Sequence, residues 1–133
     1  GGTPPAIGWS NQSTLTNTNP EKNGPISISC TYTGCYGGFQ IGNGGATIDL
    51  SGYSVVKLSL YGGTGTEGKQ VELVLNGASD ANSKVLVIHE GVWTDYTVPI
   101  SELGAPATLN EIWLKEFSNN VPETIYIDDI GIQ

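Results

Sequence analysis

Two cysteines, Cys30 and Cys35, are the residues most readily associated with chemistry in this 133-residue chain. Their spacing is not the C-x-x-C pattern of thiol redox enzymes. They cannot complete a four-ligand zinc site alone, and the single histidine, His89, is distant in sequence. We predict a local Cys30–Cys35 disulfide that closes a turn through Gly34; the alternative is a pair of buried reduced thiols. A disulfide would indicate a secreted, extracellular protein.

Catalysis finds little support in the sequence. A Ser-His-Asp mechanism needs a histidine, and His89 lies within an apolar strand pattern. Glycoside hydrolysis needs two carboxylates that face each other. Asp128 and Asp129 are adjacent, and adjacent strand residues point to opposite faces. We therefore predict no catalytic residue and no enzyme activity.

The same two aspartates point to a metal site. In "IDDI", at least one of them stands where an apolar strand favours no charge. An inward aspartate needs a cation or several donors. The stretch "NPEKNGP" offers Glu21 and the main-chain carbonyls of Lys22 and Asn23, which are oxygen ligands of the kind calcium prefers. We predict a structural calcium that ties the last strand to this loop; the alternative is two solvent-exposed aspartates.

Three aromatic residues occur in contexts that a hydrophobic core does not explain. Trp9 lies in the polar stretch "GWSNQS", Tyr36 lies between a cysteine and two glycines, and Trp113 alternates with the apolar Ile112 and Leu114. A sugar ring needs a flat aromatic to stack on and planar polar groups for its hydroxyls. The alternative is that each aromatic covers an end of the fold.

Polar side chains would hydrogen-bond the hydroxyl groups of a sugar stacked on these aromatics. We expect Gln40, Gln70 and Lys115 to fill this role. Trp93 opens a strand pattern after a glycine turn, and we interpret it as a packing residue.

These side chains must be positioned by strands, because nearly every readable segment has a two-residue period. Strands are predicted over residues 26–32, 55–60, 69–77, 84–90, 93–100, 110–117 and 124–133, with another beginning near Tyr36. The segment 84–90 is continuously apolar, which is typical of a central strand. Residues 99–111 could hold one short helical turn. The pattern predicts an all-β fold, a two-sheet antiparallel β-sandwich.

The charge composition of the chain argues against some classes of binding partner. The formal charge is −8 with only five Lys and Arg residues, which argues against nucleic acid and anionic membrane surfaces. Neutral ligands fit best. We expect residues 1–8 to be a linker remnant or an expression scar and residues 9–133 to form a single domain, a monomer within a larger multimodular chain.

Several segments in order resemble a jelly-roll carbohydrate-binding module of a secreted glycoside hydrolase. They are "NGPISISCTYTGCYGGFQI", "IDLSGYSVVKLSLYGG", "WTDYTVPISELG", "LNEIWLKEF" and "IYIDDIGI". The resemblance covers the chain from about Trp9 to Gln133. It implies a jelly roll that binds glycan without cleaving it, a structural calcium with Asp128 as a ligand, and stacking by Tyr36. Two features depart from the family: the cysteine pair, and a tyrosine where tryptophan is common.

The leading hypothesis is a non-catalytic module that targets an appended enzyme to a neutral polysaccharide, such as β-glucan or xylan. Trp9, Tyr36 and Trp113 would stack on the sugars. The alternatives are a structural or adhesive β-sandwich with a protein partner and an all-β glycoside hydrolase.

Overall fold

The computed structural model describes residues 7–11, 13–18, 20, 22–23, 27–42, 45–119 and 121–133, and only the backbone of those up to residue 18. The described chain is built from strands and two short 3-10 helices, without an α-helix. The strands are β1 (Ile7–Asn11), β2 (Ser13–Thr18), β3 (Ser27–Tyr32), β4 (Gly38–Gly42), β5 (Ile48–Asp49), β6 (Val55–Gly62), β7 (Gln70–Leu75), β8 (Ser83–Val87), β9 (Trp93–Pro99), β10 (Thr108–Leu109), β11 (Glu111–Glu116) and β12 (Glu123–Ile132). The helices are η1 (Asp80–Asn82) and η2 (Ile100–Leu103), the latter within the segment predicted to hold one helical turn.

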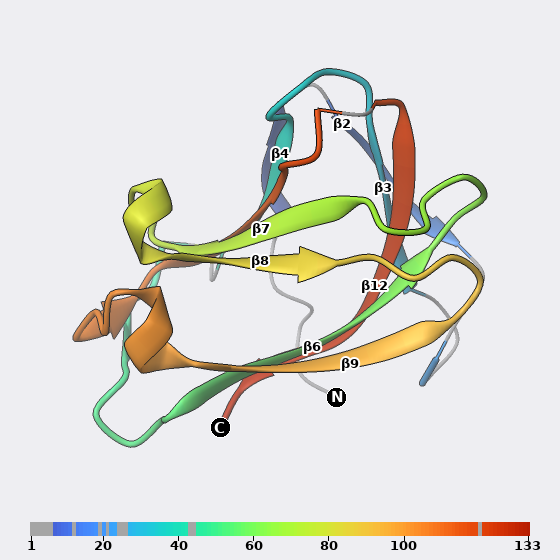
Figure 1. Cartoon of the computed structure of the whole chain (residues 1–133). Coiled ribbons are helices and arrows are strands. Elements are labelled where there is room, and N and C mark those ends of the chain that lie inside the picture. The colour runs from blue at the N-terminus through green and yellow to red at the C-terminus, as the bar shows by residue number, and fades with distance from the viewer. Residues whose placement is uncertain are drawn as a thin grey trace.

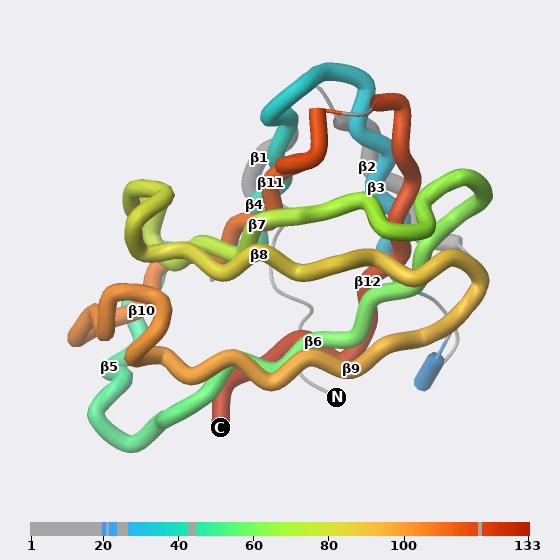
Figure 2. Tube along the Cα trace, in the orientation of Figure 1, coloured from blue at the N-terminus to red at the C-terminus, as the bar shows by residue number. Residues whose placement is uncertain are grey.

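The strands form two five-stranded antiparallel sheets that pack face to face (Figure 1). Sheet A has the order β1-β4-β11-β7-β8, and sheet B has the order β2-β3-β12-β6-β9. The short strands β5 and β10 pair at one end of the sandwich (Figure 2). This architecture confirms the predicted all-β sandwich. Strand β1 begins at Ile7, two residues ahead of the predicted domain start.

The core lies between the sheets and follows the two-residue period of the strands. In β7, Val71, Leu73 and Leu75 are buried between the sheets, and β12 contributes Ile125 and Ile127. Other fully buried side chains between the sheets are Tyr32, Phe39, Leu58, Leu60, Ile88 and Leu114. The Tyr32 hydroxyl donates a 2.9 Å hydrogen bond to the Leu114 carbonyl, which satisfies the one polar atom of that ring and ties β3 to β11.

The segment predicted as a central strand is at the edge of its sheet. Strand β8 pairs with β7 and has no further partner among the described strands (Figure 1). Its apolar run divides between the two faces: Leu86 is buried in the core, whereas Val87 points outward and is 40% exposed. The prediction was wrong because a run of β-branched residues shows strand propensity without showing which face is covered.

The predicted disulfide is also wrong, because both cysteines are free thiols. Cys30 is fully buried on the inward face of β3, where it pairs in register with Ile125. Cys35 is exposed in the turn before β4, where its thiol donates to the side-chain oxygen of Asn119. The strand directs one side chain into the core while the turn directs the other to solvent.

Candidate functional site

Four of the predicted sugar-binding residues lie on the outer face of sheet A. The strand register pairs Gln40 of β4 with Trp113 of β11, and Trp113 with Val74 of β7. Lys115 lies two residues after Trp113 on β11, and Gln70 lies four residues before Val74 on β7. Because alternate strand residues point to the same face, both share the face of Trp113 and Val74. The inward positions between them are the core residues of β11 and β7. The prediction that Trp113 faces away from its apolar neighbours is confirmed.

Two glycines lie at outward positions of strand β4, and we call Gly38, Gln40 and Gly42 the β4 lane. Gly38 and Gly42 flank Gln40 at the outward positions, so the backbone there carries little side-chain bulk. Gly38 is itself buried, and a Cβ atom on it would lie 3.4 Å from the Lys115 Cγ, whereas Gly42 is only partly buried. A glycine at an outward strand position lets a ligand approach the backbone closely, and in β4 Gly42 is the partly exposed one.

Trp113 borders this lane and is half-buried. A Cβ atom on Gly77, just after β7, would lie 3.4 Å from Cζ2 of its indole. Val74, its register partner, is fully buried although it occupies an outward position. The indole therefore rests against β7 and keeps only part of its surface available for a ligand.

Lys115 is held in place by two carboxylates. Its Nζ lies 2.9 Å from Oε2 of Glu72 and 2.9 Å from Oδ1 of Asp80. Burial lowers the pKa of Lys115, but hydrogen bonds to these two acids outweigh it and the net shift is upward. Glu72 is only 2% exposed and also accepts from the Ser83 hydroxyl. Lys115 is thus a fixed donor beside Trp113. The sequence could have indicated Glu72 as well, because it lies two residues after Gln70 and therefore points to the same face.

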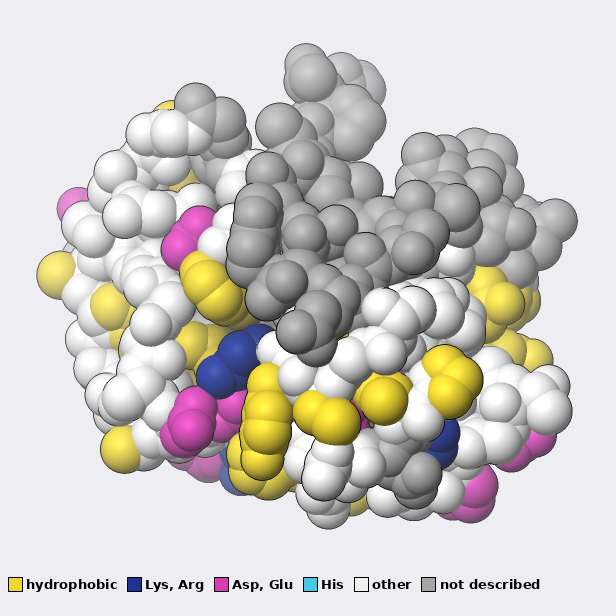
Figure 3. Space-filling view, turned by 90° about the horizontal axis from the view of Figure 1, so that it is seen from above, with side chains coloured by type: hydrophobic (Ala, Val, Ile, Leu, Met, Phe, Trp, Pro, Cys, Tyr) yellow, Lys and Arg dark blue, Asp and Glu magenta, His cyan; other side chains and the backbone are white. Residues whose placement is uncertain are grey.

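Tyr36 lies beyond the end of β4. It is 67% exposed, its φ is 59°, and its backbone N–H donates to Oε2 of Glu116 at 3.2 Å. Phe117, 36% exposed, continues the outward positions of β11 past Lys115 and was not predicted as a site residue. The two-residue period puts Phe117 on the same face as Trp113, so the sequence could have indicated it. Figure 3 shows the molecule from above the view of Figure 1, with hydrophobic side chains emerging among backbone and other side chains and lysine beside acidic groups.

Two predicted residues cannot be placed fully. The backbone of Trp9 in β1 pairs with Gln40, so Trp9 belongs to the row formed by Gln40 and Trp113, but its side chain lies outside the described residues. Glu21, a predicted calcium ligand, also lies outside them.

Asp128, the leading predicted calcium ligand, lies on the outer face of sheet B, opposite Ser59. Its Oδ2 accepts the backbone N–H groups of Lys22 at 3.1 Å and Asn23 at 3.0 Å. Successive N–H groups that converge in this way form an anion-binding concavity. The 22–23 segment is thus tied to the last strand directly through its N–H groups, whereas the predicted tie runs through carbonyls and a calcium ion.

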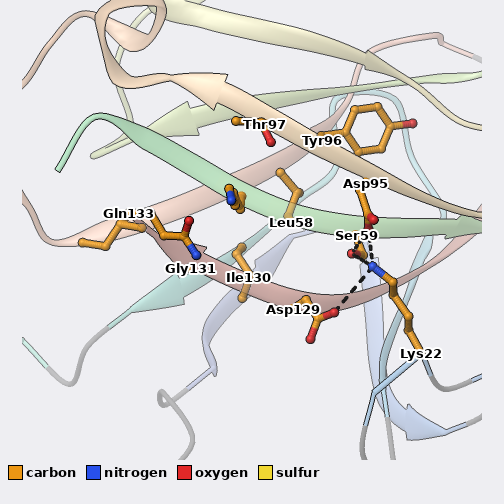
Figure 4. A pocket seen from close by; sticks show the side chains of 12 residues that line it. Lys22, Leu58, Ser59, Asp95, Tyr96, Thr97, Asp129, Ile130, Gly131 and Gln133 are labelled. Atoms are coloured by element: carbon orange, nitrogen blue, oxygen red, sulfur yellow. Dashed lines mark hydrogen bonds and ion pairs between the residues drawn. The ribbon is translucent and has the colours of Figure 1, made fainter.

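The Lys22 ammonium lies among the neighbouring acids (Figure 4). It donates to Ser59 Oγ at 2.8 Å and to Asp95, and lies 3.5 Å from Asp129. The hydrogen bond with Asp95 raises the pKa of Lys22 and lowers that of Asp95. These groups line a cavity of about 600 Å³.

This arrangement does not fit a calcium ion at Asp128. Oxygen donors would have to face the ion, whereas N–H donors occupy the carboxylate and an ammonium supplies the positive charge. Within the described part of the chain, no three His, Cys, Asp or Glu side chains gather as a metal site would require. The calcium site stays a prediction.

No known family profile matches the sequence, and comparison with curated proteins finds no relative. Solved structures are more informative. The fold is similar to the family 30 carbohydrate-binding module of a cellulosomal cellulase of Clostridium thermocellum, with a TM-score of 0.70 and 17% identity over 97% of this chain and 92% of that one. A family 11 module from the same organism, in complex with a β-1,3-1,4-mixed-linked tetrasaccharide, gives 0.65 and 14% over 93% and 85%.

An exo-β-agarase gives a TM-score of 0.71 and 15% identity over 93% of this chain, but only 23% of the agarase. These likenesses establish the fold class: the chain has the jelly-roll β-sandwich fold of carbohydrate-binding modules. No helix in the described residues is long and apolar enough to cross a membrane.

Proposed function

We propose that the chain is a non-catalytic carbohydrate-binding module whose glycan lies along β4 on the outer face of sheet A. The observation that carries this proposal is the lane of Gly38, Gln40 and Gly42 beside the half-buried Trp113. The similar solved folds, which include carbohydrate-binding modules, support the class.

The chemistry of this face suits a neutral sugar. The exposed part of the Trp113 indole offers an apolar surface to the face of a pyranose ring. The amides of Gln40 and Gln70 donate to and accept from hydroxyl groups. Lys115 adds an oriented donor whose charge is already balanced by Glu72 and Asp80. A protein of net charge −8 repels an anionic polysaccharide, so a neutral one is favoured.

The remaining parts of the proposal extend from this face. Tyr36 would stack on sugars that run past the end of β4, and Trp9 would stack beside Gln40. The module would target an appended, secreted enzyme to β-glucan, xylan or a similar neutral polysaccharide. The mixed-linkage tetrasaccharide named for the family 11 module makes mixed-linkage β-glucan the first ligand to test.

Affinity electrophoresis in gels of mixed-linkage β-glucan, xylan and galactomannan tests this proposal. The wild-type chain should be retarded in at least one gel, and Trp113→Ala and Gln40→Ala should each lose most of that retardation. Folding of every variant is checked by circular dichroism. A folded wild-type chain that is retarded in none of the gels would overturn the proposal.

Tyr53→Ala is the matched control. Tyr53 is an exposed aromatic, 42% exposed, in the turn between β5 and β6, neither of which belongs to sheet A. Its loss should leave retardation unchanged. An equal loss in Tyr53→Ala and Trp113→Ala would show that the binding surface is not the β4 lane.

A further inference from the structure

The outer face of sheet B carries a row of three aromatic residues. The register pairs Tyr126 of β12 with Tyr61 of β6, and Tyr61 with Trp93 of β9. The ring centroids of Tyr61 and Trp93 lie 5.6 Å apart, and those of Tyr61 and Tyr126 lie 5.7 Å apart. We call these three residues the aromatic row.

Core packing does not account for the aromatic row. The core positions beside it are filled by Leu60, Ile125 and Ile127, which are buried. The three aromatic side chains point away from them and are only half-buried. Contact between the rings contributes about 0.5–1.5 kcal/mol per pair. That contact orders the rings, yet part of each ring remains open to solvent.

The aromatic row lies between two hollows. One, of about 320 Å³, is lined by Tyr61 and Tyr126 together with Thr64, Glu90 and neighbouring glycines. The other is the cavity around Lys22, Ser59 and Asp95, where Ser59 and Asp95 lie two residues along β6 and β9 from the aromatic row. Aromatic surface is therefore continuous with groups that accept and donate hydrogen bonds.

We infer that the aromatic row is a second glycan-binding surface, separate from the β4 lane, which binds a single uncharged sugar chain. Partly exposed rings flanked by hydroxyl-binding groups are the combination that pyranose rings require. Asp95, Asp129 and Glu90 repel an anionic glycan and accept bonds from neutral hydroxyls. The 320 Å³ hollow lies near the small end of ligand pockets, about 300–1,000 Å³, and suits a short stretch of sugar units.

The ring planes further restrict the ligand. Tyr61 is tilted by 52° to Trp93 and by 79° to Tyr126. A flat crystalline polysaccharide surface cannot lie against all three rings at once, whereas a free chain can turn from one ring to the next. The surface should therefore bind soluble oligosaccharides in preference to crystalline cellulose.

Nuclear magnetic resonance on the wild-type chain tests the surface directly. The chain is titrated with mixed-linkage β-glucan tetrasaccharide, cellohexaose and xylohexaose, and the indole N–H signals are assigned from Trp93→Phe and Trp113→Phe. Saturable movement of the Trp93 signal by at least one oligosaccharide is expected. A static Trp93 signal with all three, while the Trp113 signal moves, overturns the second surface and leaves the proposed function standing.

Calorimetry on Trp93→Ala, Trp113→Ala and the double variant separates the two surfaces. Two sites predict a higher stoichiometry in the wild type than in either single variant, and the weakest binding in the double variant. The residual binding of Trp113→Ala should fall about tenfold when Trp93→Ala is added, and it should also weaken when Asp95→Asn is added instead. Loss of all binding in Trp113→Ala alone overturns the second surface. Loss of oligosaccharide binding in Trp93→Ala but not in Trp113→Ala overturns the β4 lane as a binding surface. No binding by the folded wild type overturns both surfaces.

Discussion

The two outer faces of the sandwich hold their charged groups in different ways. On sheet A, Lys115 is paired with Glu72, a carboxylate that is only 2% exposed. On sheet B, Lys22 is paired with Asp95, whose side chain is 71% exposed. A buried charge that loses its partner is strongly destabilising, whereas an exposed one is solvated by water. The first pair therefore supports the fold, and the second is free to exchange partners with a ligand.

The aromatic residues of the two faces also differ, because they contact one another on sheet B and stand apart on sheet A. On sheet A, Trp113 is packed against Gly77, and Tyr36 stands apart at the end of β4. On sheet B, three rings on adjacent strands contact one another in sequence. Sheet A thus offers a glycine lane with stacking at separate points, and sheet B offers a continuous but twisted platform.

Removal of Lys115 should give the largest effect. Lys115→Ala leaves the Glu72 carboxylate buried beside a single hydroxyl donor, which should cost about 3 kcal/mol in the free energy of unfolding. Urea denaturation at neutral pH measures this cost.

Lys84→Ala is the matched control for this experiment. Its partner, Glu102, and Lys84 itself are both nearly half exposed, so the change should cost less than about 1 kcal/mol. Equal losses in the two variants would show that the Lys115 pair is an ordinary surface pair and that the contrast between the faces is wrong.

Glu123 should give the next largest effect, because it lies between the two sheets at one end of the sandwich. Its Oε1 is buried without a hydrogen-bond partner among the described residues, and its Oε2 lies 3.4 Å from the Ser118 hydroxyl. That hydroxyl donates at 2.7 Å to Glu116, a second buried carboxylate. Burial, with the nearby charge of Glu116, raises the pKa of Glu123 from 4.5 to about 7.

The sign of the pH effect follows from this shift. The folded chain binds the Glu123 proton more tightly than the unfolded chain, so stability falls as the pH rises from 4.5 to about 7. Glu123→Gln should remove that fall and stabilise the chain by on the order of 1 kcal/mol above the window, after allowance for solvent screening. Thermal melts of both proteins across the window measure it. A constant difference at every pH would contradict the assignment.

The strands and the sheet A face are predictable from the sequence for a physical reason. A two-residue period determines which residues share a face, so the alternation alone separates Trp113 and Lys115 from Ile112 and Leu114. Pairing between strands distant in sequence depends on the topology, which local pattern does not contain. The meeting of Tyr61, Trp93 and Tyr126 therefore cannot be predicted, and the local pattern around Trp93 indicates only packing. The partners of Lys115 and Asp128 escape prediction for the same reason.

Lys22 should have a smaller effect. Lys22→Met removes the ammonium beside Asp95 and Asp129, both accessible to water, so the melting temperature should fall by a few degrees at most and less in high salt. A chelator should leave the wild-type melting temperature unchanged, since Lys22 supplies the positive charge at this site. A clear fall with chelator, reversed by added calcium, would instead support the predicted calcium site and require the 22–23 segment to turn its carbonyls inward.

The smallest effect is expected at the cysteines. A reductant should not change the melting temperature, because Cys30 and Cys35 are free thiols. Their different burial provides a sharper measurement than the melt. A water-soluble thiol reagent should modify exposed Cys35 in the native protein at once, and buried Cys30 only after unfolding, because the core excludes the reagent. Cys35→Ser should stay within about 0.5 kcal/mol of the wild type. A native chain in which neither thiol reacts until a reductant is added would establish the disulfide and would require the turn at Cys35 to fold back over β3.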